Sequence, residues 1–527
     1  MALLYNKMQL FARSFIEKLP GYRLSKGFFY ILMVLLPIQT GKAYFSRESF
    51  YFGYHSFYNT FFLYLTDILI FGLIVAWLCE ILLFSRETAT KQGNITHRIY
   101  TSFKQDRIYQ ILGVFWLISA ISLIFSRPPA GEAGEISLNL YGLAKISEFI
   151  LLFVYVKQNV NLSRERFRIF WLILATIFSQ AVIGIAQYLS QNSLGLKLLG
   201  EEFLRPGLKG VAEFVSHGIA NPRLYDIFPY LRPISDLTIN IRAYGTLPHP
   251  NVLAGLLFLG LIINIYLLYG NISPASPAGR RERFVKKLVL SVFWVTITTG
   301  LVVTFSRLAW VISFLAILLF AFMITKFRAK EQFLMKTGKL DYNARLYRPE
   351  RVFFIVILLL ISAAINLFVF GAQIKDRFVG VDLVGLAADN YSTAESIDNR
   401  QMFNGIAWSM IKDNLILGVG VRNFVVRMDD YSGGDRLLPY FHQPVHNIYL
   451  LIAAEGGIAT LALFFVSLFY IVRRALHEGG GGPMFNYTLF IIFFGFLFWG
   501  LFDHYFWTIQ QGSLAFWMVA GLLANKK

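Results

Sequence analysis

Cysteine is nearly absent from this chain of 527 residues, which contains only Cys79. A single cysteine cannot form an internal disulfide, so the exterior loops must be ordered by packing, and redox chemistry is not expected. Charged residues are also scarce, at 15% of the chain against 56% hydrophobic residues. A soluble protein of this length could not bury so much apolar surface in one core, and the composition therefore predicts a membrane protein.

Motifs of several common enzyme classes are missing as well. The sequence has no G-x-x-x-x-G-K-[ST] phosphate loop and no H-E-x-x-H zinc motif, and residues 418–423 read G-x-G-x-x-N, without the third glycine of a dinucleotide loop. No internal repeat is evident. The basic N-terminus is not followed by a signal-peptide cleavage pattern, so we interpret the apolar segment from Gly27 as a retained helix.

Long apolar windows, in contrast, are abundant. Windows near the ~20 residues that cross a ~30 Å hydrocarbon core occur at 27–45, 61–84, 108–126, 140–157, 168–190, 251–270, 287–305, 308–326, 351–371, 447–472, 486–503 and 510–524. These windows predict an all-α polytopic membrane protein with about twelve transmembrane helices.

The basic residues favour one orientation of these helices. With the N-terminus inside, the inner segments and the adjoining helix ends hold 31 of the 49 Lys and Arg residues, the outer ones hold 17, and Lys145 lies within a span. This bias follows the positive-inside rule and predicts that both termini face the cytoplasm. The net charge of +18 then reflects topology and attraction to anionic lipid, and we expect no nucleic-acid partner.

Two long segments, 191–250 and 372–446, interrupt the alternation of helices and short loops, and both fall on the outer face. They separate the helices of 1–190, 251–371 and 447–527, and we expect the chemistry to lie in them. Within the second segment, an interrupted apolar stripe over 396–414 predicts a short helix lying on the membrane. Gly418 and Gly420 then permit a turn back toward the bilayer.

His446 stands where the second long segment meets the apolar helix that begins at Asn447. An imidazole has a reference pKa near 6.5, so it can take up or hold a proton at neutral pH, as a transferase requires. The competing interpretation is an interfacial or helix-capping histidine.

Arginines form a second pattern at the outer face. Arg307 lies in the tight turn between the seventh and eighth helices, Arg242 precedes the sixth helix, and Arg400 lies on the predicted surface helix. Guanidinium groups that converge on one cavity are suited to bidentate binding of a diphosphate. For any one of them, snorkelling to the lipid–water boundary is the alternative.

Ionisable residues inside the membrane are the third pattern, because a buried charge is costly and is usually paired or functional. Asp67, Lys145 and Glu455 each lie on the order of 10 Å from the outer end of their helices. Lys145 can pair with Asp67 or with Glu148, one turn away. A structural polar cluster and a functional one are both consistent with this pattern.

Together these motifs resemble the O-antigen ligase/polymerase family of integral membrane glycosyltransferases, from about Arg242 to Trp517. The resemblance rests on Arg242-x-x-Gly245-Thr246, His249-Pro250-Asn251, Thr304-Phe305-Ser306-Arg307, Asp413-Asn414-x-x-x-Gly418-x-Gly420-x-x-Asn423-Phe424, and His446-Asn447 with Glu455 and Gly457. Lipid A-core ligases often have Gly-x-x-Gly after the His-Asn pair, and Thr460 here replaces its second glycine. This departure leaves the ligase subtype open.

The resemblance implies a GT-C-like fold, with short helices in the long outer loops, in the cytoplasmic (inner) membrane. It also implies a glycan donor linked to polyprenyl (undecaprenyl) diphosphate in the outer leaflet, and no cofactor or metal. In this scheme Arg242 and Arg307 bind the diphosphate and stabilise the leaving group, Arg400 or Lys145 assists, and His446 deprotonates or orients an acceptor hydroxyl. The supporting residues are His249, Asn251, Asn447, Asp67 and Glu455, of which Glu455 is interpreted as structural.

Other activities remain open at this stage. The acceptor can be a glycan, a lipid or a protein, which corresponds to a polymerase, a ligase or a protein O-oligosaccharyltransferase. A secondary transporter also has about twelve spans, although its site lies near the midplane. A peptidoglycan polymerase relies on an outer-loop carboxylate, for which Asp382, Asp389, Asp429 and Asp430 are available without the surrounding motif. A passive assembly scaffold is the last alternative.

Overall fold

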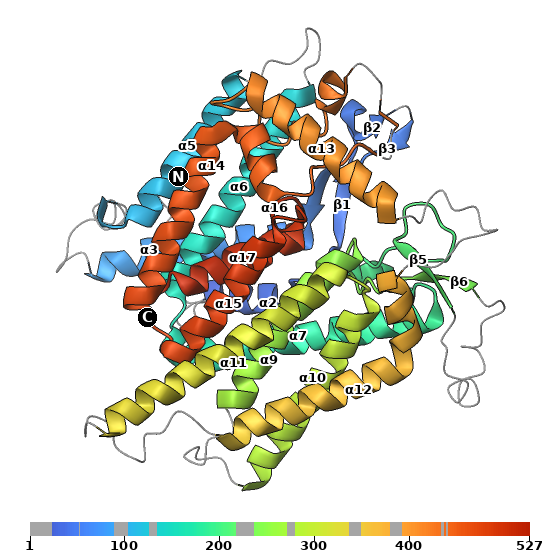
Figure 1. Cartoon of the computed structure of the whole chain (residues 1–527). Helices are drawn as coiled ribbons and strands as arrows, with labels where there is room; N and C mark the ends of the chain where they lie inside the picture. Colours follow the sequence, from blue (N-terminus) through green and yellow to red (C-terminus); the bar gives the residue numbers. More distant parts are fainter. Residues whose placement is uncertain are drawn as a thin grey trace.

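The computed structural model describes residues 24–51, 53–88, 104–125, 134–217, 237–270, 280–336, 349–379, 393–433, 437–438 and 441–527. Over these residues the chain is mostly helical (Figure 1). The N-terminal 23 residues and the outer-loop carboxylates Asp382 and Asp389, which the sequence singled out, lie outside the described residues.

Within the described residues, each predicted apolar window overlaps one helix. In order these are α2 (Leu24–Leu35), α3 (Leu65–Thr88), α5 (Arg107–Phe125), α6 (Gly134–Asn159), α7 (Leu162–Ser190), α9 (Pro250–Gly270), α10 (Arg280–Val303), α11 (Arg307–Lys336), α12 (Pro349–Val379), α14 (Ile448–Glu478), α15 (Pro483–Trp499) and α17 (Gln510–Leu523). Eight of them are long and apolar enough to cross a membrane, namely α3, α6, α7, α9, α10, α11, α12 and α14. A polytopic helical membrane protein is thereby supported, and the full count of twelve spans stays a prediction.

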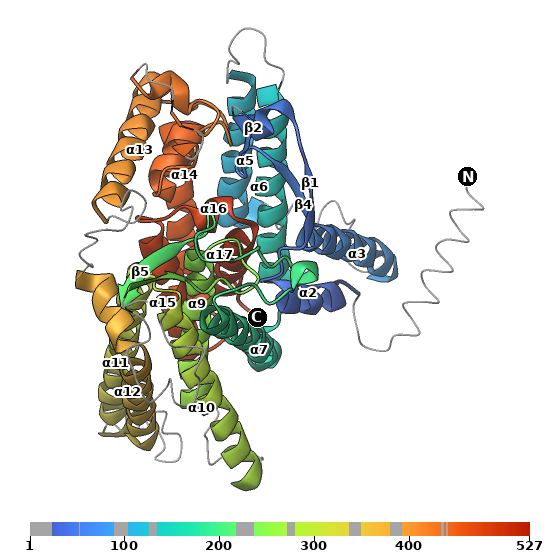
Figure 2. The same ribbon diagram turned by 90° about the vertical axis from the view of Figure 1, so that its right-hand side faces the viewer.

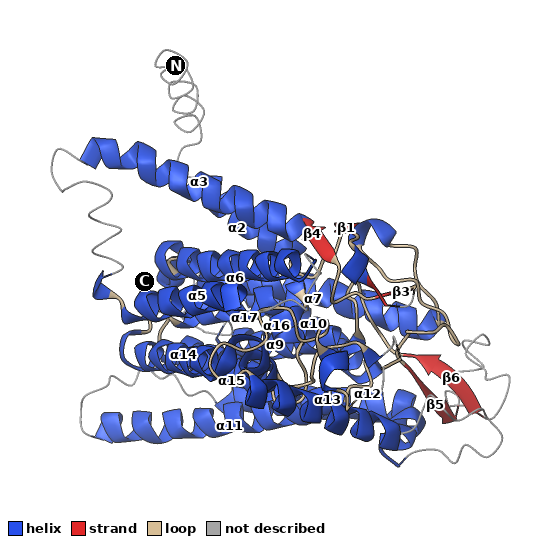
Figure 3. Cartoon of the chain, turned by 90° about the horizontal axis from the view of Figure 1, so that it is seen from above, coloured by secondary structure: helices blue, strands red, loops and turns tan. Residues whose placement is uncertain are grey.

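Three short antiparallel strand pairs correct the expectation of an all-α fold. They are β1 (Gly41–Tyr44) with β4 (Phe61–Tyr64), β2 (Phe50–Tyr51) with β3 (Tyr54–His55), and β5 (Glu213–His217) with β6 (Leu237–Ile241). The first two helical windows included β1 and β4, because a short apolar run such as Phe-Phe-Leu-Tyr does not distinguish strand from helix. The strand pairs lie at one end of the bundle and the C-terminus toward the other (Figure 3).

Helix α9 forms the centre of the bundle. It packs against α7, α10, α11 and α15, and Figure 2 shows it surrounded by other helices. The apolar window of α9 is 100% buried by protein, whereas that of α12 is only 22% buried, so most of its side chains are not covered by the bundle. Pro250 at the first turn of α9 suits a position where no backbone N–H partner exists.

The second long segment contains α13 (Thr393–Asp413), which confirms the helix predicted over 396–414. Its orientation differs from the expectation. Four residues of the predicted stripe, Phe403, Ile406, Met410 and Ile411, are buried in a cluster with side chains of α14. The apolar stripe therefore packs against protein rather than lipid, because the first turns of α14 offer a matching apolar face.

Helix α14 is broken at Gly457, which has a φ of 76°. The loop after α13 enters this break: Val419 N–H donates to Ala454 O at 2.8 Å, and Gly420 N–H donates to Glu455 O at 2.9 Å. A Cβ at position 457 would lie 1.9 Å from Ile416 O, so only glycine fits. Gly418 and Gly420 have φ values of 68° and 102°, in agreement with the predicted turn.

Candidate active site

In the turn between α10 and α11, two consecutive backbone carbonyl groups accept hydrogen bonds from two arginines. Phe305 has a left-handed φ of 46°, which is uncommon for a residue with a side chain. Thr304 O accepts a hydrogen bond from Arg242 Nε at 2.6 Å, and Phe305 O accepts one from Arg377 Nε at 3.2 Å. The strained turn thus anchors a guanidinium from the first outer segment beside one from the end of α12.

Arg307 begins α11 two residues beyond this turn. Burial, followed by the positive charge of Arg377 and to a smaller extent that of Arg307, lowers the pKa of Arg242 to about 9. The shift shows that the three positive charges are close enough to repel one another. A cluster of this kind is stabilised by a bound anion.

A chain of polar contacts connects this arginine cluster with His446. Arg242 Nη2 donates to Asn251 Oδ1 at 2.9 Å, and Asn251 Nδ2 donates to Asp503 Oδ2 at 2.9 Å. The other carboxylate oxygen, Oδ1, lies 3.8 Å from His446 Nδ1. Asn251 comes from the first turn of α9 and Asp503 from the connection between α15 and α16 (Tyr505–Thr508).

Asp503 and the histidines around it differ in charge at neutral pH. Burial raises the pKa of the Asp503 carboxyl, but His446, His504 and His249 lower it more, so that it lies well below its usual range and Asp503 stays ionised. Burial lowers the pKa of His504 and of His249 to about 3, so both rings are neutral at neutral pH. His504 Nδ1 is also hydrogen-bonded to Thr508 Oγ1 at 2.7 Å.

A cavity of about 510 Å³ opens beside these residues. It is lined by residues of several loops and of α9 and α16, among them His249, Asn251, His446, Asp503 and His504, with Tyr58 from the first outer hairpin and Glu202 and Lys209 from segment 191–250. We name it the histidine cavity. The arginines are not among its described lining residues, and Arg242 connects with it through Asn251.

Asp503 and the two adjacent histidines also raise the question of a metal. Ligand atoms of His446, Asp503 and His504 lie within 4.8 Å of one another. A zinc ion at ~2.1 Å from each ligand would bring tetrahedral ligand atoms to about 3.4 Å, so the group would have to contract to hold one. The expectation of no metal therefore stays a prediction.

Lys145 lies in a separate cluster. Its Nζ is 2.6 Å from Asp67 Oδ2 and 3.3 Å from Glu148 Oε2, so both of the alternative ion pairs are present. Gln510 of α17 accepts a hydrogen bond from Lys145 at 3.1 Å and donates to Glu148 at 3.2 Å. These contacts join α3, α6 and α17, and none of them brings Lys145 to the arginines.

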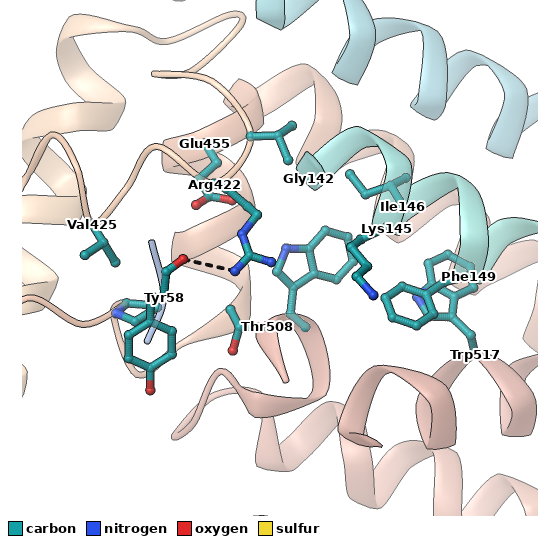
Figure 4. Close-up of a pocket in the computed structure, with 13 residues that line it drawn as sticks. Tyr58, Gly142, Lys145, Ile146, Phe149, Arg422, Val425, Glu455, Thr508 and Trp517 are labelled. Atoms are coloured by element: carbon teal, nitrogen blue, oxygen red, sulfur yellow. Dashed lines mark hydrogen bonds between the residues drawn. The ribbon is translucent and has the colours of Figure 1, made fainter. Parts of the chain in front are cut away.

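Lys145 and Glu455 line a smaller pocket of about 60 Å³, in which Arg422 lies beside the Glu455 carboxylate (Figure 4). Arg422 Nη2 donates to Tyr58 O at 3.0 Å, and Glu455 Oε1 accepts from Phe424 N–H at 3.4 Å. Glu455 therefore supports the loop that enters the break in α14. Tyr58 borders both this pocket and the histidine cavity.

Among the described residues, Asn447 and Arg400 form no hydrogen bond with Asp503 or Asn251. Asn447 caps α14, because its Oδ1 accepts from Tyr449 N–H at 2.9 Å and Leu450 N–H at 3.1 Å. Arg400 lies one turn before Phe403, whose ring centroid is 6.2 Å from that of His446. No hydrogen bond or ion pair joins Arg400 to another described residue.

Asp429 and Asp430 form local pairs. Asp429 Oδ1 is 3.2 Å from His442 Nε2, and Asp430 is 2.7 Å from Arg427 Nε. Neither carboxylate is among the described lining residues of the histidine cavity. This arrangement gives no support to a loop-carboxylate polymerase.

Sequence reasoning missed Asp503, His504 and Arg377. Asp503 and His504 are adjacent ionisable residues between two apolar windows, in a connection that the topology places on the same face as His446. Arg377 follows the ninth window at the same level as Arg307. Their predicted position near the outer face of the membrane was therefore the feature of the sequence that could have identified them as site residues.

Residues 292–465 match a family model described as O-antigen ligase. This segment is similar to the O-antigen ligase family. None of the curated proteins compared with the chain matches it. The matched segment contains the 304–307 turn, Arg377 and His446, and the similarity supports a multi-pass membrane glycosyltransferase of the O-antigen ligase/polymerase type.

Proposed function

We propose that the chain transfers a glycan from a polyprenyl diphosphate donor to an acceptor hydroxyl at the outer face of the cytoplasmic membrane. The observation that carries this proposal is the chain of contacts from Arg242 through Asn251 and Asp503 to His446, beside a cavity large enough for sugar rings. These contacts support an assignment in which Arg242 binds the donor and His446 acts as the base.

The arginines act on the donor. Arg242, Arg307 and the newly identified Arg377 hold the diphosphate and stabilise the negative charge that develops as the anomeric C–O bond breaks. Because Arg242 and Arg377 are fixed on backbone carbonyls, their charges are oriented before the donor binds. The leaving group departs as polyprenyl diphosphate, so the donor supplies its own activation.

His446 acts on the acceptor. Asp503 faces its Nδ1 and favours the tautomer with the proton on that nitrogen, which leaves Nε2 free to accept the hydroxyl proton. The acceptor oxygen then forms the new bond to the anomeric carbon. Asp503 stays ionised and stabilises the imidazolium as it forms, while neutral His504 and His249 add no competing positive charge.

The remaining residues support this framework. Asn251 orients Asp503, Asn447 fixes the start of the helix that follows His446, and Arg400 serves the donor only if α13 brings it closer on binding. Lys145 and Asp67 hold α3, α6 and α17 together. In this assignment Lys145 does not assist with the diphosphate.

The test is transfer by the purified chain from a synthetic polyprenyl diphosphate glycan, in the presence of a metal chelator and without nucleotide. Wild type should give the transferred product and polyprenyl diphosphate in equal amounts, and Asp503→Asn should give almost none. Full activity of Asp503→Asn, or consumption of donor without release of polyprenyl diphosphate, would refute the mechanism.

Product length separates the activities within the family. Addition of a single glycan block to an added acceptor identifies a ligase, and a ladder formed from donor alone identifies a polymerase. Transfer to a peptide hydroxyl identifies a protein O-oligosaccharyltransferase. Accumulation of donor in sealed vesicles without any transfer identifies a transporter.

A further inference from the structure

A second charged cavity, of about 430 Å³, lies at the far end of α14 from His446. We name it the basic pocket. It is formed by the start of α5, the last two turns of α14 and the C-terminal segment, and its lining residues are Gln105, Asp106, Arg107, Ile108, Tyr470, Arg473, Arg474, His477, Glu478 and Lys526. The lining residues from α14, Tyr470 to Glu478, belong to the end of the helix, whereas His446 precedes its first residue, Ile448.

The acidic residues of the basic pocket are already engaged. Asp106 is bound by Lys157 and by Arg474, and Glu478 is bound by Lys526. Four Lys or Arg residues line the pocket against two carboxylates, so these six residues carry a net charge of +2. The positive charge of the pocket is therefore not balanced by its own carboxylates.

Two arginines carry this excess charge. Arg107 is exposed and donates from Nη1 to Tyr470 Oη at 3.0 Å, which leaves it without a carboxylate partner among the described residues. Arg473 is also exposed, and no ion pair joins it to another described residue. Guanidinium groups in this situation are suited to a phosphate, which accepts several N–H donors at once.

The walls next to the pocket are apolar. Helices α5 and α14 pack side by side (Figures 1 and 2). Phe469 is 60% exposed and Leu476 is 63% exposed on α14, and Leu117 is 51% exposed further along α5. A ligand held by the arginines could therefore extend apolar chains along the two helices, which a soluble anion cannot do.

We propose that the basic pocket binds the phosphate headgroup of an anionic membrane phospholipid, at the membrane surface opposite the histidine cavity. Basic pockets between transmembrane helices bind such headgroups, and phosphate at this depth is supplied by the bilayer itself. The bound lipid would connect α5, α14 and the C-terminal segment.

The test uses the full chain in detergent, stripped of lipid and titrated separately with phosphatidylglycerol, phosphatidylcholine and inorganic phosphate, with bound adducts counted by native mass spectrometry. Phosphatidylglycerol should remain bound, and Arg107→Gln/Arg473→Gln should weaken its binding at least about tenfold. Arg281→Gln, an exposed arginine at the start of α10, is the matched control and should leave binding unchanged.

Three results would overturn the proposal. An equal loss in Arg281→Gln would reduce the effect to general surface charge. Equal binding of inorganic phosphate would show that the pocket takes a soluble anion, and equal binding of phosphatidylcholine would remove the selectivity for anionic lipid. Because both arginines are exposed, the double variant should fold, and Arg473→Gln alone provides a milder test of the same contact.

Discussion

Two polar clusters within this helical bundle differ in how their charges are balanced. In the first, Lys145 lies between the carboxylates of Asp67 and Glu148, with Gln510 completing the contacts. In the second, the hydrogen bonds of Arg242 within the described part of the chain go to a carbonyl and to a side-chain amide. The carboxylate of Asp503, which is joined to Arg242 through Asn251, faces His446.

The difference indicates which cluster needs a ligand. A buried charge that has its partner in the protein holds helices together, and removing one partner is costly. A cluster whose positive charges lack a partner is complete only with an anion bound, and charges of this kind mark functional sites. From this comparison we expect Lys145 to stabilise the fold, and the arginines and His446 to act on the substrates.

The largest effect is expected at His446. Replacement with alanine removes the group that accepts the acceptor proton, so turnover should fall by about 10²–10⁴-fold while donor binding is largely retained. Both quantities can be measured with a labelled lipid-linked donor and membranes matched for protein level. His55→Ala, an exposed histidine of β3, is the control, and retention of more than about a tenth of the activity by His446→Ala would remove the base role.

The second effect separates the two clusters directly. Lys145→Met leaves two buried carboxylates without their cation, which should cost about 3–5 kcal/mol of stability. The measurement is the thermal unfolding temperature and the membrane level of the variant. Activity per folded molecule should stay close to wild type, and a selective loss of donor affinity would instead return Lys145 to the diphosphate site.

The third effect tests geometry at constant charge. Arg307→Lys keeps net charge and topology but loses bidentate contact, so transition-state stabilisation should fall by roughly 1.5–3 kcal/mol. Arg307→Ala should lose at least as much, and Arg281→Lys should lose nothing. If Arg307→Lys turned over the donor at the full rate, Arg307 would be an interfacial anchor and the arginine cluster would lose a member.

The fourth effect concerns pH. Burial holds the pKa of His504 at about 3, against 6.5 in the unfolded chain, so only the unfolded chain takes up this proton between pH 6.5 and 3. The stability that His504 contributes is present above pH 6.5 and is lost as the pH falls, by about 2 kcal/mol between pH 7 and 5. Unfolding temperatures of wild type and His504→Asn at both pH values measure it, and equal pH slopes would contradict the assignment.

The smallest effect contrasts two asparagines. Asn447→Ala removes a helix cap and should cost about 1 kcal/mol of stability with little change in turnover. Asn251→Ala interrupts the contact between Arg242 and Asp503 and should reduce turnover more than stability. Stability and turnover measured for both variants distinguish a helix cap from a residue that positions Asp503. Equal changes in both quantities for the two variants would contradict this distinction.

The helices could be predicted from the sequence because lipid imposes a long apolar run on each span. The short strands could not, since β1 and β4 extend apolar windows without changing their composition. The orientation of α13 was also not predictable, because its apolar stripe suits either lipid or the face of α14. An apolar stripe indicates that a helix face is shielded from water, but it does not indicate whether lipid or another helix shields it.

The candidate site was likewise predictable only in part. Motif spacing and predicted depth placed His446, Arg242 and Arg307 at one face, and the turn at 304–307 required an arginine at its surface. The partners of these residues depend on side-chain contacts between segments more than 200 residues apart, such as Asn251 with Asp503. No local pattern carries that information, so Asp503 emerged only from the fold.

The burial of α9 has a consequence for how the protein meets different membranes. Asn251 lies in the first turn of a helix that lipid does not touch, so the height of the polar chain is fixed by neighbouring helices. Lipid-facing helices such as α12 meet a thicker or thinner bilayer and can tilt to accommodate it. The alignment of Arg242, Asp503 and His446 should therefore be insensitive to acyl-chain length, even where the outer helices adjust.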